Sequence, residues 1–151
     1  MRAALCDDEK THNNHLEELL RDYKRRKEID IFEISGYTSC HELLEKHTTD
    51  KFDFIFLDVD MPIMNGFETA ECIREIDLDA AIVFVTRVAE QIPMGYNYNA
   101  KQYLCKPVTQ EDIDILMDRL VREHLRNKDY GRYSIRLKNT GVIEFLTVIS
   151  L

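Results

Sequence analysis

The strongest constraint on the fold of this chain is an alternation of short apolar runs with amphipathic helical stretches, repeated five times. The apolar runs lie, in chain order, at residues 3–6, 29–34, 54–57, 80–85 and 102–105. Each run is followed by a stretch in which apolar residues recur three to four positions apart, as on one face of a helix. Strands that alternate with helices predict a parallel sheet with helices on both faces. Right-handed crossovers make this an α/β, doubly wound (βα)5 sandwich with a five-stranded parallel sheet.

Helix start signals support these assignments. Ser39 and Glu42 form a capping-box pattern, and Asn65 and Thr109 precede two later helical stretches as N-caps. The helical pattern around 89–99 is weaker, because a proline and a glycine interrupt it.

The end of the chain has a different pattern. Apolar and polar residues alternate over 133–138, a turn signal follows at 139–141, and an apolar run begins at Val142. This predicts a C-terminal β-hairpin. A lone hairpin is marginally stable in water, so we interpret 127–151 as a linker and the start of an incomplete β-rich domain that follows a domain of residues 1–126. An extra hairpin packed on the main domain is the alternative.

Composition narrows the class of protein. The 151 residues are 44% hydrophobic and 32% charged, an ordinary balance for a globular domain that buries a core without disulfides. The formal net charge of −8 argues against contact between these residues and nucleic acid. The four cysteines form no C-x-x-C pair, which argues against a zinc or thioredoxin-type site. With no signal peptide and no run long enough to span a membrane, we expect a cytoplasmic protein with reduced thiols and no membrane partner.

Polar residues stand where the apolar runs end. Asp7 and Asp8 follow the first run, Asp58 the third, Thr86 the fourth and Lys106 the fifth. The carboxyl ends of parallel strands meet at one edge of the sheet, where ligands bind in this class of fold. Clustered carboxylates repel each other, and Mg²⁺ would offset the repulsion, since it binds one or two carboxylates together with water and phosphate oxygens. A magnesium ion beside a carboxylate and a lysine suits phosphoryl transfer.

These residues lie in motifs that resemble those of the response-regulator receiver family of two-component systems. The motifs are CDDE at 6–9, FIFLDVDMP at 54–62, Asn65-Gly66, Val85-Thr86 and YLCKP at 103–107. The resemblance covers residues 1–126 and implies the flavodoxin-like form of the doubly wound fold. It also implies a signalling domain that accepts a phosphoryl group, and not a classical enzyme. Its own chemistry would be limited to autocatalytic phosphoryl transfer and hydrolysis.

The resemblance implies a role for each acidic position. Asp58 matches the phosphoacceptor. Asp8 and Asp58 match the carboxylates that bind Mg²⁺ (or Mn²⁺), with the backbone carbonyl of Asp60 as a third ligand. Asp7 matches the second acidic residue of the pocket, which acts on the metal through water.

The remaining motif residues match a phosphate-binding and switching set. Lys106 and Thr86 match the groups that bind the phosphoryl oxygens, and the bond before Pro107 is cis in the family. Thr86 and Tyr103 match the switch pair: Thr86 moves toward the phosphoryl group and Tyr103 turns inward.

The family resemblance also implies partners. A sensor histidine kinase would phosphorylate the domain, and a homodimer would form through the helix around 89–99, the strand 102–105 and the last helix. Residues 132–151 resemble the start of a LytTR-type DNA-binding domain. Phosphorylation would then control a transcriptional output domain, and DNA would be contacted only through the part of that domain that is missing here.

One position departs from the family pattern. Arg87 follows the switch threonine, where the family usually has a small residue. Its long cationic side chain would either hinder access to Asp58 or bind phosphoryl oxygens. Two other polar features receive no functional role: the basic run 24–27 is interpreted as a solvated helix end, and His12 and His15 as solvated side chains.

Two other functions fit parts of the pattern. Asp58-Val59-Asp60 resembles the Asp-x-Asp motif of haloacid-dehalogenase-type phosphatases, although those enzymes usually carry it on the first strand and it leaves Asp7 and Asp8 unexplained. A flavin-binding or phosphorylation-deficient module on the same fold is the second alternative. It is disfavoured because the acidic set is complete and no glycine-rich phosphate loop follows the first strand.

Overall fold

The computed structural model describes residues 1–29, 33–87 and 102–140, with the backbone alone for 129–140. The strands are β1 (Arg2–Cys6), β2 (Glu33–Tyr37), β3 (Phe54–Asp58), β4 (Ala81–Thr86) and β5 (Gln102–Cys105). The helices are α1 (Lys10–Lys27), α2 (Cys40–Thr49), α3 (Gly66–Ile76) and α4 (Gln110–Thr140). In the described part of the chain, no helix is both long enough and apolar enough to cross a membrane.

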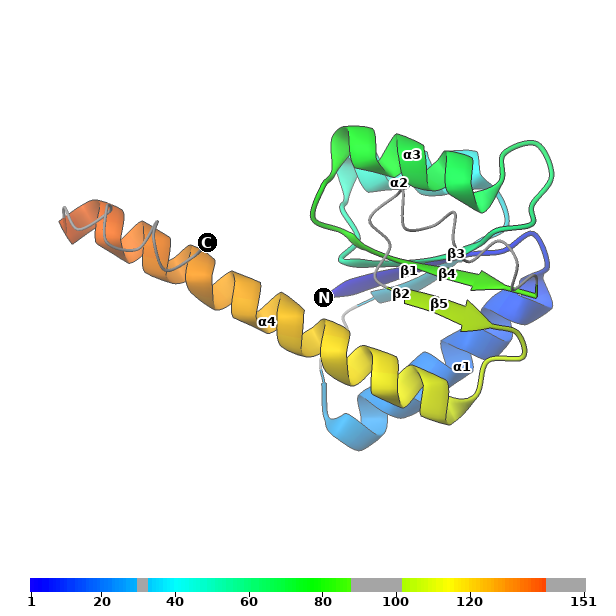
Figure 1. Ribbon diagram of the computed structural model, residues 1–151, viewed down its shortest axis with the longest axis horizontal. Coiled ribbons are helices and arrows are strands. Elements are labelled where there is room, and N and C mark those ends of the chain that lie inside the picture. The colour runs from blue at the N-terminus through cyan, green and yellow to red at the C-terminus, as the bar shows by residue number, and fades with distance from the viewer. Residues whose placement is uncertain (30–32, 88–101, 141–151) are drawn as a thin grey trace. The chain divides into compact units, whose positions relative to one another are not determined.

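The strands form one parallel sheet in the order β2-β1-β3-β4-β5. Helix α1 lies on one face of the sheet, and α2 and α3 lie on the other (Figure 1). The predicted doubly wound parallel sheet is therefore confirmed. The strand order reverses at β1, so the carboxyl ends of β1 and β3 lie side by side at the switch point where such folds bind ligands.

The central strands are buried on both faces. Every residue of β3 and β4 is buried, as expected for parallel strands covered by helices. On one face, alternate strand residues pack with apolar side chains of α2 and α3, including Leu43, Phe67 and Ile73. On α1, Leu16 and Leu20 are buried. Asp58 and Thr86 therefore end strands that are buried along their whole length.

The predicted strand at 29–34 corresponds to β2, which is described from Glu33 onward, while residues 30–32 lie outside the described residues. Residues 29–34 were expected as a strand, but Ile29 belongs to the end of α1, where its backbone N–H donates to the carbonyl of Lys24 at 3.1 Å. Glu28 closes this cap in the left-handed region, with φ 53°. The strand is at an edge of the sheet and is only partly buried, so it needs no continuous apolar run.

Two of the three predicted N-caps form as expected. The Asn65 side chain accepts a hydrogen bond from the Glu68 backbone, and the Glu68 side chain returns one to Asn65. The Thr109 hydroxyl caps α4 in the same way. Ser39 does precede α2, but its side chain makes no capping hydrogen bond, so the predicted box with Glu42 is wrong.

Helix α4 continues through Thr140, and this differs from the predicted hairpin. The first predicted arm, 133–138, is helical. An alternating pattern forms a strand only where a neighbouring strand accepts its backbone hydrogen bonds, and the described residues offer none there. The second arm and the predicted helix around 89–99 lie outside the described residues. The chain divides into two compact units, Met1–Asp114 and Ile115–Leu151. This division does not test the predicted boundary at 126/127, and the incomplete output domain stays a prediction.

A buried polar network holds the amino ends of β3 and β4. His47 is fully buried, its Nδ1 accepts the Phe52 backbone N–H at 3.0 Å, and its Nε2 lies 3.0 Å from Asp77 Oδ2. The proton of the ring therefore sits on Nε2 and is donated to Asp77. Burial lowers the pKa of His47 despite the opposing effect of Asp77. Asp77 also accepts the backbone N–H groups of Asp79 and Ala80, which closes the network.

Candidate functional site

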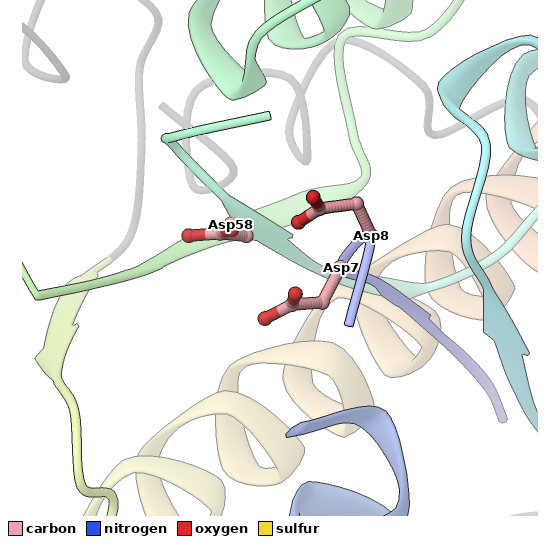
Figure 2. Close-up of side chains that lie close together, drawn as sticks. All are labelled: Asp7, Asp8 and Asp58. Carbon is pink, nitrogen blue, oxygen red and sulfur yellow. The ribbon is translucent and has the colours of Figure 1, made fainter. Parts of the chain in front are cut away.

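Three carboxylates meet at the carboxyl ends of β1 and β3. Asp7 and Asp8 follow β1, and Asp58 is the last residue of β3, whose Leu57 pairs with Cys6. One carboxylate oxygen of each acid lies within 4.8 Å of the others, and Figure 2 shows the three side chains gathered beyond the strand ends. Asp7 and Asp58 are buried, whereas Asp8 is exposed. This donor set fits a hard divalent cation that keeps some of its water.

Lys106 brings a cation to the same cluster from the loop after β5. Its Nζ lies 2.6 Å from Asp7 Oδ2 and 3.4 Å from Asp58 Oδ1, and its side chain is largely buried. The Lys106 backbone N–H donates to the carbonyl of Thr86, which joins this loop to β4. The Lys106–Pro107 peptide bond is cis. The ammonium group is thus held between the two buried acids.

The environment of the Asp58 carboxyl disfavours its ionised form. Burial, together with the neighbouring Asp7 carboxylate, raises the pKa of Asp58 to about 6, and Lys106 only partly offsets this. A buried carboxylate with a raised pKa is costly to ionise. A bound cation at the cluster would favour the ionised form that a nucleophile needs.

The raised pKa predicts a pH-dependent cost of folding. As the pH rises from the usual carboxyl value of 3.8 to about 6, the unfolded chain ionises Asp58 before the folded chain does, so stability falls. Without divalent cations at pH 7, Asp58→Asn is expected to raise the free energy of unfolding by about 1–3 kcal/mol, and the gain should vanish near pH 4. Urea titrations at both values measure it. The exposed neighbour is the control: a similar gain in Asp60→Asn would contradict the prediction.

Gly66 brings the start of α3 against the end of β3. Its backbone N–H donates to the Val59 carbonyl at 3.1 Å. A Cβ at this position would lie 2.4 Å from the Asp58 carbonyl oxygen and 2.9 Å from the Val59 Cα. Both are backbone atoms that no side-chain rotation can move. Only glycine therefore allows α3 to begin this close to Asp58.

Gly66→Ala is expected to destabilise the fold by about 1–3 kcal/mol, the usual cost of overpacking, and to displace the carboxyl end of β3. Gly36→Ala is the matched control, since a Cβ at Gly36 meets the Asn13 side chain at an ordinary 3.5 Å. Chemical denaturation of both variants measures the difference. Equal stability of the two variants would show that the helix start relaxes away from the strand.

The predicted switch residues lie on adjacent strands. Thr86 ends β4 and is fully buried, and Tyr103 lies in β5, partly buried. The Tyr103 ring is 5.3 Å from the ring of Phe84. Asp60 is exposed, and its backbone N–H lies 3.4 Å from Asp58 Oδ1. The switching role of Thr86 and Tyr103 and the metal-binding role of the Asp60 carbonyl stay predictions.

Sequence reasoning missed two residues of α1 that hold Asp7. Asn13 is buried, and its side-chain NH₂ donates to the carbonyls of Asp7 (3.2 Å) and Tyr37 (2.9 Å). Its position was detectable, because Asn13 is a polar residue three positions before Leu16 on the apolar face of α1. The second residue is His12, whose Nδ1 lies 3.2 Å from Asp7 Oδ2.

Of the two histidines of α1 that were expected to be solvated, His15 is exposed, whereas His12 is only partly exposed. His12 contacts Asp7, and His15 Nε2 lies 2.9 Å from the carbonyl of Val108. Arg87 also has a defined position: its Nη2 lies 2.8 Å from His12 Nε2 and 3.6 Å from a Glu9 carboxylate oxygen. Arg87, which departs from the family pattern, therefore contacts a side chain of α1.

A cavity of about 370 Å³ adjoins Asp58. Apolar side chains, including Leu16, Phe56 and Val108, line much of it, and His12 and Lys106 are among its polar groups. A small molecule entering it would meet the acidic cluster.

Comparison with known proteins decides the family. The model of the response regulator receiver domain matches residues 3–118. The chain belongs to the response-regulator receiver family. As a receiver domain, it is part of a signalling protein and not a classical enzyme, and its acidic cluster matches the magnesium pocket of that family.

Curated relatives and solved structures agree with this assignment. The receiver chain is 30% identical over 131 residues to the sensory transduction protein LytR of Staphylococcus epidermidis, covering 85% of this chain and 50% of that protein. It is 32% identical over 114 residues to LytT of Bacillus anthracis, covering 75% and 44%. The chain thus spans about half the length of these relatives.

Two solved receivers share its fold. The response regulator TrrA of Thermotoga maritima, solved in complex with Mg²⁺-BeF, is 25% identical with a TM-score of 0.68, covering 79% of this chain and 97% of that one. The response regulatory domain of mrkE from Klebsiella pneumoniae is 23% identical with a TM-score of 0.70, covering 82% and 97%.

Proposed function

We propose that Asp58 of this receiver domain accepts a phosphoryl group from a sensor histidine kinase in a reaction that requires Mg²⁺ or Mn²⁺. The observation that carries the proposal is the cluster of Asp7, Asp8 and Asp58, with Lys106 Nζ between the two buried acids. Few other chemistries need three carboxylates and a lysine at the end of a buried strand.

The residues of the cluster have separate roles in the proposed phosphoryl transfer. An Asp58 carboxylate oxygen attacks phosphorus while the bond from phosphorus to the donor nitrogen breaks, and the donor keeps that electron pair. Asp8, Asp58 and the Asp60 carbonyl would hold the cation, with Asp7 acting through water. The bound metal supplies positive charge for the phosphoryl oxygens.

Other residues act on the phosphoryl oxygens. Lys106 donates from Nζ to one of them, and the Thr86 hydroxyl donates to another once the group is attached. Hydrolysis of the aspartyl phosphate within the same site returns the domain to its resting state. The raised pKa of Asp58 supports the need for a cation before attack.

The proposed output is a repacking of the β4–β5 side of the domain. Movement of Thr86 toward the phosphoryl group would leave space for Tyr103 to turn inward, a shift between two packings. A homodimer through this side, and DNA binding through a LytTR-type domain beyond residue 127, complete the proposal. The names of two curated relatives, a sensory transduction protein and a transcriptional regulatory protein, support such an output.

Intact mass spectrometry after incubation with Mg²⁺ and acetyl phosphate tests the phosphoacceptor function. We expect one phosphoryl group per chain, and none when the divalent cation is chelated. Sustained release of phosphate from a phosphomonoester would instead favour a phosphatase built on Asp58 and Asp60. An adduct that forms equally well in a chelator would contradict the metal requirement.

A further inference from the structure

His12 connects Arg87 to the acidic cluster. Its two ring nitrogens face different partners: Nδ1 lies 3.2 Å from Asp7 Oδ2, and Nε2 lies 2.8 Å from Arg87 Nη2. Arg87 comes from the end of β4 and His12 from the first turn of α1. His12 therefore links Arg87 to Asp7, a carboxylate of the proposed metal pocket.

The partners determine where the ring carries its proton. A guanidinium has only donors, so Nε2 accepts from Arg87 and carries no hydrogen. The remaining hydrogen of a neutral ring is then on Nδ1, where it points to Asp7 Oδ2. Lys106 Nζ also lies 3.2 Å from Nδ1, but Lys106 is donor-only, so both groups donate to the same Asp7 oxygen.

The other arrangements of the ring fit the geometry less well. An imidazolium would bring two cationic N–H groups together at the 2.8 Å contact with Arg87. A ring protonated on Nε2 would direct that N–H at the guanidinium, which only donates and lies 2.8 Å away, or at Glu9 Oε2 at a longer 3.5 Å. Its Nδ1 could then accept only from Lys106 Nζ at 3.2 Å, beside the Asp7 carboxylate. Glu9 also lies 3.6 Å from Arg87, which favours the position of the guanidinium.

Within the described residues, both carboxylate oxygens and the backbone carbonyl of Asp7 accept hydrogen bonds. Its Oδ1 accepts the Glu9 backbone N–H at 2.8 Å, and its carbonyl accepts from Asn13. Its Oδ2 accepts from His12 and Lys106. If Lys106 turns to a phosphoryl oxygen, as the proposed function requires, His12 still donates to Oδ2.

We propose that Arg87 and His12 form a positioning pair: Arg87 fixes the Nδ1–H tautomer of His12, and His12 orients Asp7 for the divalent cation. The proposal rests on the proposed function, because it concerns the same pocket. It gives Arg87 a role through α1, with no direct contact to the phosphoryl group. Groups that orient a metal-binding carboxylate typically affect metal affinity by ~10–100-fold.

The first test is the tautomer of His12, read from the ¹⁵N shifts of its ring in the cation-free protein. Wild type is expected to show Nδ1–H. Arg87→Ala is expected to raise the share of the Nε2–H ring, because Nε2 loses its donor and a bare Nδ1 can accept from Lys106 Nζ at 3.2 Å. Arg21→Ala, which removes an exposed arginine paired with Glu17 on the same helix, is the control and should leave His12 unchanged. A wild-type ring protonated on Nε2 would overturn the proposal.

The second test is Mg²⁺ affinity, measured by calorimetry without any phosphodonor. His12→Leu is expected to weaken binding by ~10-fold, while His12→Asn should retain most of it, because the Asn NH₂ can replace the Nδ1–H donor. His15→Gln, on the same helix but bonded to Val108, is the control and should bind as wild type does. Unchanged binding by His12→Leu, or equal losses in Leu and Asn variants, would overturn the positioning role alone. Wild type that binds no cation would overturn the proposed function as well, whatever tautomer His12 shows.

Discussion

Asp58→Asn is expected to abolish phosphorylation of the domain. The amide keeps the size of the side chain but lacks a carboxylate oxygen that can attack phosphorus. Asp58 is buried at the end of a strand that is buried along its whole length, and the proposal assigns the attack on phosphorus to this carboxylate alone. The intact mass after incubation with Mg²⁺ and acetyl phosphate should show one added phosphoryl group in wild type and none in the variant.

The matched control is Asp60→Asn, two residues further on. Its side chain is exposed, and the proposal assigns the metal contact to its backbone carbonyl, so the variant should still be phosphorylated. A phosphoryl group on Asp58→Asn that resists removal of the cation would show that another residue is the acceptor. A urea titration of Asp58→Asn in the assay buffer shows whether the variant is folded, which distinguishes loss of the acceptor from unfolding.

Lys106→Met is expected to give the largest loss of stability among single changes at the site. It leaves Asp7 and Asp58 buried without the ammonium group that lies 2.6 Å and 3.4 Å from them. Removal of one partner from a buried ion pair costs about 3–5 kcal/mol. We expect about 3 kcal/mol, because Asp58, with its raised pKa, can take up a proton and reduce the repulsion.

Urea denaturation in a chelator measures this loss, and added Mg²⁺ should recover part of it by binding the folded state. Lys46→Met is the control: Lys46 lies 3.4 Å from Asp50 in an exposed pair, for which a loss below about 1 kcal/mol is expected. Equal losses in the two variants would mean that Lys106 does not hold the buried acids together. Phosphorylation of Lys106→Met should also be slowed, since the cation that faces the phosphoryl oxygens is gone.

The main features of the site could be predicted from sequence because strand ends are easy to locate. Asp58 and Lys106 each follow a short apolar run, and parallel strands end at the same edge of a sheet. The order of residues along the chain therefore placed these groups together without any side-chain geometry. The same reasoning placed Asp7 and Asp8 beside Asp58.

Features that depend on side-chain direction could not be predicted in this way. His12 contacts Asp7 because α1 turns back over the end of β1, and residue spacing alone does not fix that turn. Ile29 was predicted to lie in a strand, but its backbone N–H takes part in the cap of α1. The alternating pattern over 133–138 predicts a strand, but a strand needs a partner, and the helix continues where none is described.

The two edges of the sheet at which its strands begin and end have different roles. The network of His47 and Asp77 lies at the amino ends of the strands, whereas phosphoryl chemistry is proposed at the carboxyl ends. A substitution at His47 is therefore expected to change the stability of the fold while the acidic cluster at the opposite edge of the sheet keeps its residues and their charges.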